Sequence, residues 1–295
     1  MVTGKGGVGK SAVSAALSLA AARRGERVLA IELGAPSGLA GLLGVAPTEH
    51  GIPVDAGQGI ALAFYDGEAA LREYVLRRVP FKGAFDRLFE HPLYRAFIEA
   101  GPGIRELLAI GKVRDEVLGL ATGEPAWDRI VLDAGASGDA LELLGMPSAA
   151  ARTFHSGLVH REATRVARWL ADGQACEVHV VALPEEMPLK EARDILAWLR
   201  DLQLPLGSLI VNRCRRSAPP GASAAVAALR TNDGASQALA ATAKRALGWL
   251  ALQEAGIARL ETESGRAVTR LPTLPSVTFG WPEVAALADA LGEMA

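Results

Sequence analysis

The feature that most constrains this chain is a glycine-rich stretch at its N-terminus, Gly4-Lys5-Gly6-Gly7-Val8-Gly9-Lys10-Ser11. It fits the pattern G-x-x-x-x-G-K-[ST], a loop that joins a strand to a helix and binds phosphate. Its glycines let the backbone turn tightly, so that several N–H groups converge on one anion, and the helix adds its positive end. We expect this loop and Ala12 to hold a nucleotide's phosphates, with Lys10 at the β- and γ-phosphates and Ser11 on Mg²⁺.

Apolar strand patterns alternate with helical patterns along the rest of the chain. Only Met1 to Thr3 precede the loop, so the strand entering it is either very short or the chain start lacks residues. Alternation of this kind predicts an α/β fold, a mostly parallel sheet with helices on both faces. We expect residues 1–295 to form a single domain. Further strands are expected at 28–31, 60–65, 127–133, 178–183, 209–212 and 267–271.

Residues 66–122 differ from this alternation, because they are almost continuously helical in pattern. Phe81, Phe85 and Phe89 recur every four residues, the spacing of one helix face. The segment predicts a helical subdomain inserted in the main domain. A second interpretation is that the same apolar side chains form a groove for a protein client.

Two polar residues end buried strands and are candidates for the site. Asp133 closes the apolar run 130–132, the form of a strand whose carboxylate holds the Mg²⁺ shell of a nucleotide. Asn212 closes 209–211, and its amide offers both a donor and an acceptor for a purine. Each also has a structural interpretation, because Asp and Asn commonly cap the turn or helix after a strand.

Composition excludes several other classes of protein. The net charge of −2 and the pI near 6.2 argue against nucleic-acid and membrane-surface binding. No window of about 20 residues is apolar enough to span a bilayer, and the phosphate loop occupies the place of a signal peptide. The two cysteines, Cys176 and Cys214, have no metal-ligand spacing and suit a reducing compartment. We therefore expect a cytoplasmic protein.

Taken together, the motifs resemble the ArsA-type ATPases, a family with arsenite-pump ATPases and ATPases that guide tail-anchored membrane proteins. Lys5 is the added lysine of the deviant Walker A branch of P-loop NTPases. Further points of resemblance are the loop 133–138, Gly-Ile-Arg-Glu-Leu-Leu at 103–108, Leu-Pro-Glu-Glu-Met-Pro-Leu-Lys-Glu-Ala-Arg at 183–193, Leu-Ile-Val-Asn-Arg at 209–213 and Leu-Pro-Thr-Leu-Pro at 271–275.

The resemblance implies a role for each matching position. Family members are dimers with ATP and Mg²⁺ at the subunit interface, so we expect a homodimer or a heterodimer with a paralogous ATPase. Lys5 resembles the signature lysine that crosses to the partner's nucleotide, and Asp133 the switch II aspartate. Asn212 matches the asparagine that reads adenine, and Pro272 and Pro275 fall in the loop that borders the base.

The chain also departs from the family pattern at the switch I loop. Gly34 stands where the family has the aspartate that orients the attacking water, and glycine cannot position or deprotonate water. Glu32, two residues upstream, is an alternative base. Two features by which family members bind their clients are absent as well. The chain has only four methionines, too few for a methionine-rich groove, and it lacks a cysteine trio for arsenite.

Three functions therefore remain open from the sequence. The first is an ATPase whose hydrolysis resets a nucleotide-closed dimer. The second is a regulatory subunit that binds ATP without hydrolysing it and pairs with an active paralogue. The third is a small-molecule kinase or synthetase, which would need a second substrate pocket.

Overall fold

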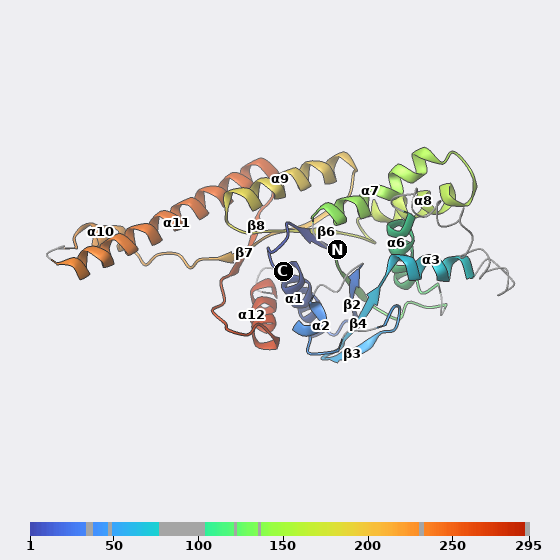
Figure 1. Ribbon diagram of the computed structural model, residues 1–295, viewed down its shortest axis with the longest axis horizontal. Coiled ribbons are helices and arrows are strands. Elements are labelled where there is room, and N and C mark those ends of the chain that lie inside the picture. Colours follow the sequence, from blue (N-terminus) through green and yellow to red (C-terminus); the bar gives the residue numbers. More distant parts are fainter. Residues whose placement is uncertain are drawn as a thin grey trace.

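The fold is organised around one eight-stranded sheet (Figure 1). The computed structural model of the chain describes residues 1–33, 38–46, 49–76, 104–120, 123–134, 137–229 and 233–292. The strand order is β3-β4-β2-β5-β1-β6-β7-β8, and every pair is parallel except the edge pair β3–β4. The strands are β1 (Val2–Gly4), β2 (Val28–Leu33), β3 (Val54–Gly57), β4 (Ile60–Tyr65), β5 (Arg129–Asp133), β6 (Val178–Ala182), β7 (Leu206–Cys214) and β8 (Val268–Pro272).

Helices cover both faces of this sheet, as the apolar strands require. On one face lie α1 (Lys10–Arg23), α2 (Leu39–Leu42) and α12 (Trp281–Gly292). On the other face lie α6 (Ile104–Val117), α7 (Ser137–Thr153), α8 (Gly157–Leu170), α9 (Glu186–Asp201) and the C-terminal part of α11 (Gly234–Ser264), and α3 (Gly67–Leu76) packs on α6. The short α10 (Ala222–Ala227) precedes α11.

Alternation along the strands creates two separate cores. In β2, Val28 and Ala30 pack with α1 and α12, whereas Leu29 and Ile31 pack with α6 and α7. All four side chains are fully buried, which explains why the strand reads as a continuous apolar run and not as an alternating one.

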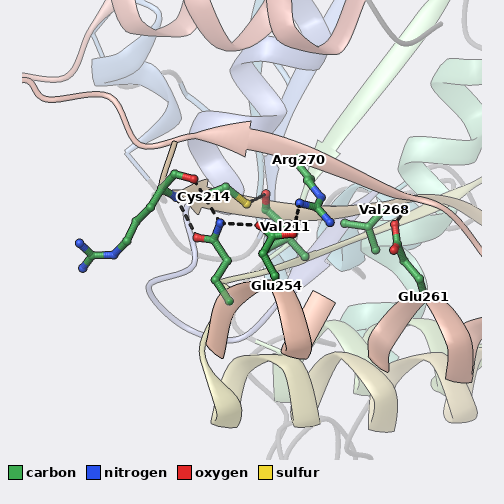
Figure 2. Close-up of polar contacts among 8 residues, drawn as sticks. Val211, Cys214, Glu254, Glu261, Val268 and Arg270 are labelled. Carbon is green, nitrogen blue, oxygen red and sulfur yellow. Dashed lines mark hydrogen bonds and ion pairs between the residues drawn. The ribbon is translucent and has the colours of Figure 1, made fainter. Parts of the chain in front are cut away.

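The long helix α11 extends beyond the sheet (Figure 1). Its C-terminal half is attached to β7 and β8 by polar contacts as well as by buried Ile257 and Leu260. Glu254 accepts a hydrogen bond from Arg270 at 2.7 Å, and Glu261 accepts one from the Val268 backbone at 3.1 Å (Figure 2). Its N-terminal half projects away from these contacts towards α10.

The sequence located most of these elements, and the predicted α/β fold is confirmed. The strand that enters the glycine-rich loop, whose length the sequence left open, is the three-residue β1. Three elements differ from what the sequence predicts. The antiparallel edge strand β3 was missed, because its half-exposed residues lack an apolar run. The amphipathic pattern of residues 153–172 predicts a helix from Thr153, but α8 begins only at Gly157, after Ser156 in extended conformation. The helical pattern of residues 236–255 predicts a helix that ends at Ala255, but α11 continues to Ser264.

The helical insertion is described at its two ends, α3 and α6. Residues 77–103, with the predicted phenylalanine stripe, lie outside the described residues. The single domain over 1–295 and the subdomain over 66–122 stay predictions. Among the helices that the structure describes, none is long and apolar enough to cross a membrane.

His179 in β6 gives the fold a testable pH dependence. Its Nδ1 accepts the Ser208 N–H at 2.9 Å, and burial, assisted by the N-terminal ammonium and Arg129, lowers its pKa from 6.5 to about 3. The unfolded chain therefore binds the proton first as the pH falls, and stability is lost from pH 6.5 down to about 3. At pH 5 this loss amounts to about 2 kcal/mol.

His179→Gln, which retains an acceptor, should remove that part of the acid sensitivity. Urea unfolding of both proteins at pH 7 and pH 5 measures it. An equal loss of unfolding free energy in the two proteins would contradict a neutral, buried His179.

Candidate functional site

The glycine-rich loop connects β1 to α1 at the centre of the sheet, and two of its glycines are sterically required. Gly4 has φ 150°, and a Cβ there would lie 2.1 Å from the Val181 carbonyl oxygen of β6. Gly9 has φ 93°, and a Cβ there would lie 2.4 Å from Asn212 Nδ2. Real Cβ contacts are never that short, so the loop packs against two neighbouring strand ends in a way that only glycine permits.

The loop also has the properties of an anion cradle. A Cβ at Gly6 or Gly7 would meet no atom within 4 Å, so this part of the backbone faces open space. Helix α1 begins after Gly9 without a side-chain cap and without an acidic residue in its first turn. Its first N–H groups therefore point at the loop and present positive potential. The residues present thus fit the phosphates of a nucleotide.

Both lysines of the motif are held near the loop. Lys10 Nζ donates a hydrogen bond to the Lys5 carbonyl oxygen at 3.1 Å, so the ammonium lies across the loop backbone. Lys5 Nζ is 3.5 Å from Glu191 Oε2 of α9, and the two side chains are 38% and 30% exposed. Exposed pairs of this kind stabilise by at most about 1 kcal/mol, so Lys5 can exchange Glu191 for another anion.

Asp133 lies at the carboxyl end of β5, beside the strand that enters the loop. It is buried (1% exposed) and is the register partner of Val2 in β1. Its Oδ1 accepts a hydrogen bond from Ser14 Oγ at 3.1 Å. Because Ser14 is one helical turn beyond Ser11, helix α1 positions the carboxylate on the same side of the loop as the Ser11 hydroxyl. This places the two predicted Mg²⁺ ligands on adjoining elements.

Ser14 was not identified from the sequence. The available signal is the spacing of Ser11, Ser14 and Ser18, which puts three hydroxyls along one side of α1. Ser18 Oγ donates to the Ser14 carbonyl at 2.8 Å, whereas Ser14 turns its hydroxyl to the strand carboxylate.

Glu32 is a second buried carboxylate at the same sheet edge. It is 2% exposed, and its register partner in the neighbouring strand is Asp133. Its Oε1 accepts the Leu39 N–H at 2.8 Å, which holds the start of α2 against the end of β2. The loop between them, residues 34–37 with Gly34, lies outside the described residues. Glu32 thus has a positioning contact, and its role as a base stays a prediction.

Asn212 makes a contact that neither interpretation of the sequence foresaw. It is 4% exposed, and its Nδ2 donates to the Val8 carbonyl of the glycine-rich loop at 2.9 Å. Its Oδ1 accepts the Arg213 N–H at 2.9 Å. The side chain therefore clamps the phosphate loop to β7. By count, one N–H and one lone pair of the amide are left over and could bind a base. The adenine-reading role therefore stays a prediction.

The predicted base-bordering loop starts at the same edge. Pro272 ends β8 and is the register partner of Cys214. Thr273 donates to the Cys214 carbonyl through its N–H and to the Arg213 carbonyl through Oγ1, both at 2.8 Å. Pro272 is thus tied to the segment that follows Asn212. Pro275 is exposed in the loop beyond, and its part in binding a base stays a prediction.

A glycine-rich loop between β1 and α1, next to a strand-end aspartate in a mostly parallel sheet, defines a P-loop NTPase fold. Comparison with known proteins agrees: the profile of the ArsA ATPases, described as anion-transporting ATPases, matches residues 1–162. The chain belongs to this family.

Individual relatives are similar over half of the chain or more. The ATPase BagA of Mycobacterium tuberculosis is 34% identical over 221 residues, which cover 72% of this chain and 64% of that protein. Protein Rv2184c of the same organism is 30% identical over 72% of this chain and 58% of its own length. An arsenical pump-driving ATPase of Acidiphilium multivorum is 31% identical over 50% of this chain and 25% of that protein. The match thus spans less than two thirds of each relative.

The Asn212 clamp can be separated from base recognition. Asn212→Ala leaves the Val8 carbonyl without its donor, a cost of about 1–3 kcal/mol, and frees the loop. We expect at least tenfold weaker binding of both MgATP and magnesium tripolyphosphate, measured by calorimetric titration. If Asn212 served the base alone, only MgATP binding would weaken.

Proposed function

We propose that this chain is an ArsA-type ATPase that binds ATP and Mg²⁺ and couples its nucleotide state to a partner protein. One observation carries the proposal. The phosphate loop with Lys10 and Ser11 lies next to Asp133, a buried carboxylate held by the same helix that follows the loop.

The chain's residues can be assigned roles in this reaction. The backbone N–H groups of residues 6–11 and the start of α1 hold the β- and γ-phosphates, and Lys10 neutralises their charge. Ser11 and, through its shell, Asp133 would hold Mg²⁺, which when bound neutralises phosphate charge during transfer. Ser14 keeps the Asp133 carboxylate aimed at this place, and burial excludes water from it.

A dimer with the nucleotide at its interface is part of the proposal. Support comes from Lys5, whose side chain lies at the surface in a weak pair with Glu191 and is free to change partner when a second subunit approaches. The second subunit is either a copy of this chain or a paralogous ATPase. The helices of 66–122 are the proposed contact for a protein client.

Arsenite is a poor candidate for the client. Arsenite binding needs clustered thiolates, but Cys176 precedes β6 and Cys214 ends β7, so the two cysteines lie at opposite ends of these neighbouring parallel strands. Burial also raises the pKa of both thiols, that of Cys214 to about 11, which keeps them protonated. We therefore propose a protein, and not arsenite, as the client of this chain.

Turnover tests the proposed ATPase directly. Lys10→Ala removes the phosphate-facing ammonium, and Asp133→Asn keeps the shape but removes the charge. Each should lower the rate of ATP hydrolysis at least 100-fold, as is typical when one transition-state contact is lost. Phosphate release from the purified chain is the measurement. Arg161→Glu on α8, far from the loop, is the control and should leave the rate unchanged. If the wild-type chain hydrolyses ATP no faster than Lys10→Ala does, the hydrolytic part of the proposal is contradicted.

The second candidate is a regulatory subunit that binds ATP but does not hydrolyse it alone. Gly34 in place of the switch I aspartate favours it, together with the commitment of Glu32 Oε1 to the Leu39 N–H. A site without a water-orienting carboxylate retains phosphate binding and loses the hydrolytic step.

Gly34→Asp separates the two candidates. If the missing carboxylate limits the rate, the substitution should raise turnover at least tenfold with little change in ATP affinity. Gly41→Asp, at an exposed position of α2 where a Cβ meets no other atom, serves as the matched control. If the wild-type chain hydrolyses ATP, and this rate is unchanged by Gly34→Asp and abolished by Asp133→Asn, the regulatory-subunit hypothesis is ruled out.

A further inference from the structure

A groove with a volume of about 1070 Å³ lies between α9 and α11, at the carboxyl ends of β6, β7 and β8. We call it the α9–α11 groove and define it by its apolar wall, Leu183, Leu189, Trp249 and Leu252, and by the arginines beside them. Its volume is at the upper end of the range for small-ligand sites. It is separate from the phosphate loop, and no step of the proposed ATPase reaction uses it.

The apolar wall is exposed to an unusual degree. Trp249 is 54% exposed and Leu252 is 70% exposed, although both line the groove. Leu239, also on α11 and nearer its tip, is 61% exposed. Large apolar side chains gathered along one helix are typical of an interaction surface and not of a solvated helix.

Positive charge surrounds this wall. Five arginines and two glutamates line the groove, although the whole chain has a net charge of −2. Arg193 and Arg259 are ion-paired with Glu263. Within the described part of the chain, no ion pair is formed by Arg213, Arg215 or Arg216. The groove is therefore locally basic, with arginines beside its apolar wall.

The groove is rigid where the two features meet. The Arg215 guanidinium lies 4.5 Å from the centre of the Trp249 ring, a cation–π contact. The backbone of Arg215 is clamped by Gln253 of α11, which accepts its N–H at 2.8 Å and donates to its carbonyl at 3.1 Å. Gln253 is only 3% exposed. A fixed aromatic with a fixed charge on its rim is the arrangement of a binding hot spot.

We propose that the α9–α11 groove docks an acidic amphipathic helix of a partner protein. Leucine and tryptophan side chains on one helical face match helix-in-groove recognition, and carboxylates on its flank complement the arginines. A second copy of this chain fits less well, because a symmetric contact would set the arginines against themselves. The net charge of −2 also disfavours a nucleic acid.

The groove is connected to the phosphate loop by one short segment. Asn212 binds the Val8 carbonyl of the loop, and three residues later the Arg215 backbone binds Gln253 of α11. A shift of the loop on nucleotide binding therefore reaches the groove through residues 212–215. This nucleotide dependence, unlike the docking itself, rests on the proposed function.

Two designed 18-residue helical peptides test the docking. Both carry leucine and tryptophan at the same i, i+3, i+4, i+7 positions, with glutamate in one and lysine in the other at the flanking positions. Fluorescence anisotropy on the full chain without nucleotide should show the glutamate peptide binding at least tenfold more tightly than the lysine peptide, and weakening as salt rises.

Variants locate the binding. Leu252→Glu and Arg215→Glu should each weaken the glutamate peptide at least tenfold. Two matched controls should not: Ile52→Glu, an exposed apolar residue beside the opposite edge strand, and Arg161→Glu on α8. Circular dichroism and the unfolding midpoint confirm that all four variants fold.

Each outcome decides the matter. Failure of the glutamate peptide to bind, equal binding of the lysine peptide, or indifference to Leu252→Glu overturns the docking site. If the wild-type chain sediments as a dimer and Leu252→Glu dissociates that dimer, the groove belongs to a second copy of the chain, and the docking proposal is also overturned.

The coupling to nucleotide has its own outcome. If the peptide binds and MgATP binds, but MgATP changes the peptide's affinity less than twofold, the link through 212–215 is overturned and the docking stands. If MgATP does not bind, the proposed function fails independently.

Discussion

The contact on which the whole site depends is that between the phosphate loop and the ends of the two strands beside it. Gly4 lies against the Val181 carbonyl of β6, and Gly9 against the Asn212 amide of β7. These approaches leave no space for a side chain, so the loop conformation is set by the sheet and not by the loop alone. The central place of β1, between β5 and β6, makes this possible. The strand is short but fully buried, and it fixes the loop relative to Asp133 on one side and Asn212 on the other.

A second consequence of the parallel sheet is the concentration of buried polar groups at one edge. Asp133, Glu32 and Asn212 are each less than 5% exposed and lie at the carboxyl ends of three strands. Burying carboxylates costs free energy unless each is hydrogen-bonded. Ser14 and the Leu39 N–H provide those bonds, and they also bind α1 and α2 to the site. The polar groups that chemistry requires are therefore the same groups that position the flanking helices.

The sequence predicted what depends on period and motif, and missed what depends on tertiary contact. The strand ends at Asp133 and Asn212 follow from apolar runs that stop at a polar residue. That Asn212 clamps Val8, residues more than 200 positions apart, could not be read from either segment. Ser14 reads as an ordinary helix residue until β5 is placed beside it. The length of α11 was underestimated because its alanine-rich sequence has a weak apolar period, and its attachment depends on Glu254, Glu261 and Gln253 contacting strands.

Strand β7 joins the phosphate loop to the α9–α11 groove. Its end supplies Asn212 to the phosphate loop and, within three residues, the backbone that Gln253 of α11 clamps. Thr273 binds the carbonyls of the two residues between them, so the segment 212–215 is held from the loop, from α11 and from the end of β8. A segment fixed at several points moves as a unit or not at all. In the proposed coupling, a nucleotide that moves the loop acts on the groove through this segment, and a partner bound in the groove acts on the loop through the same segment. Reciprocity of this kind is what linkage requires of any coupling between two binding sites.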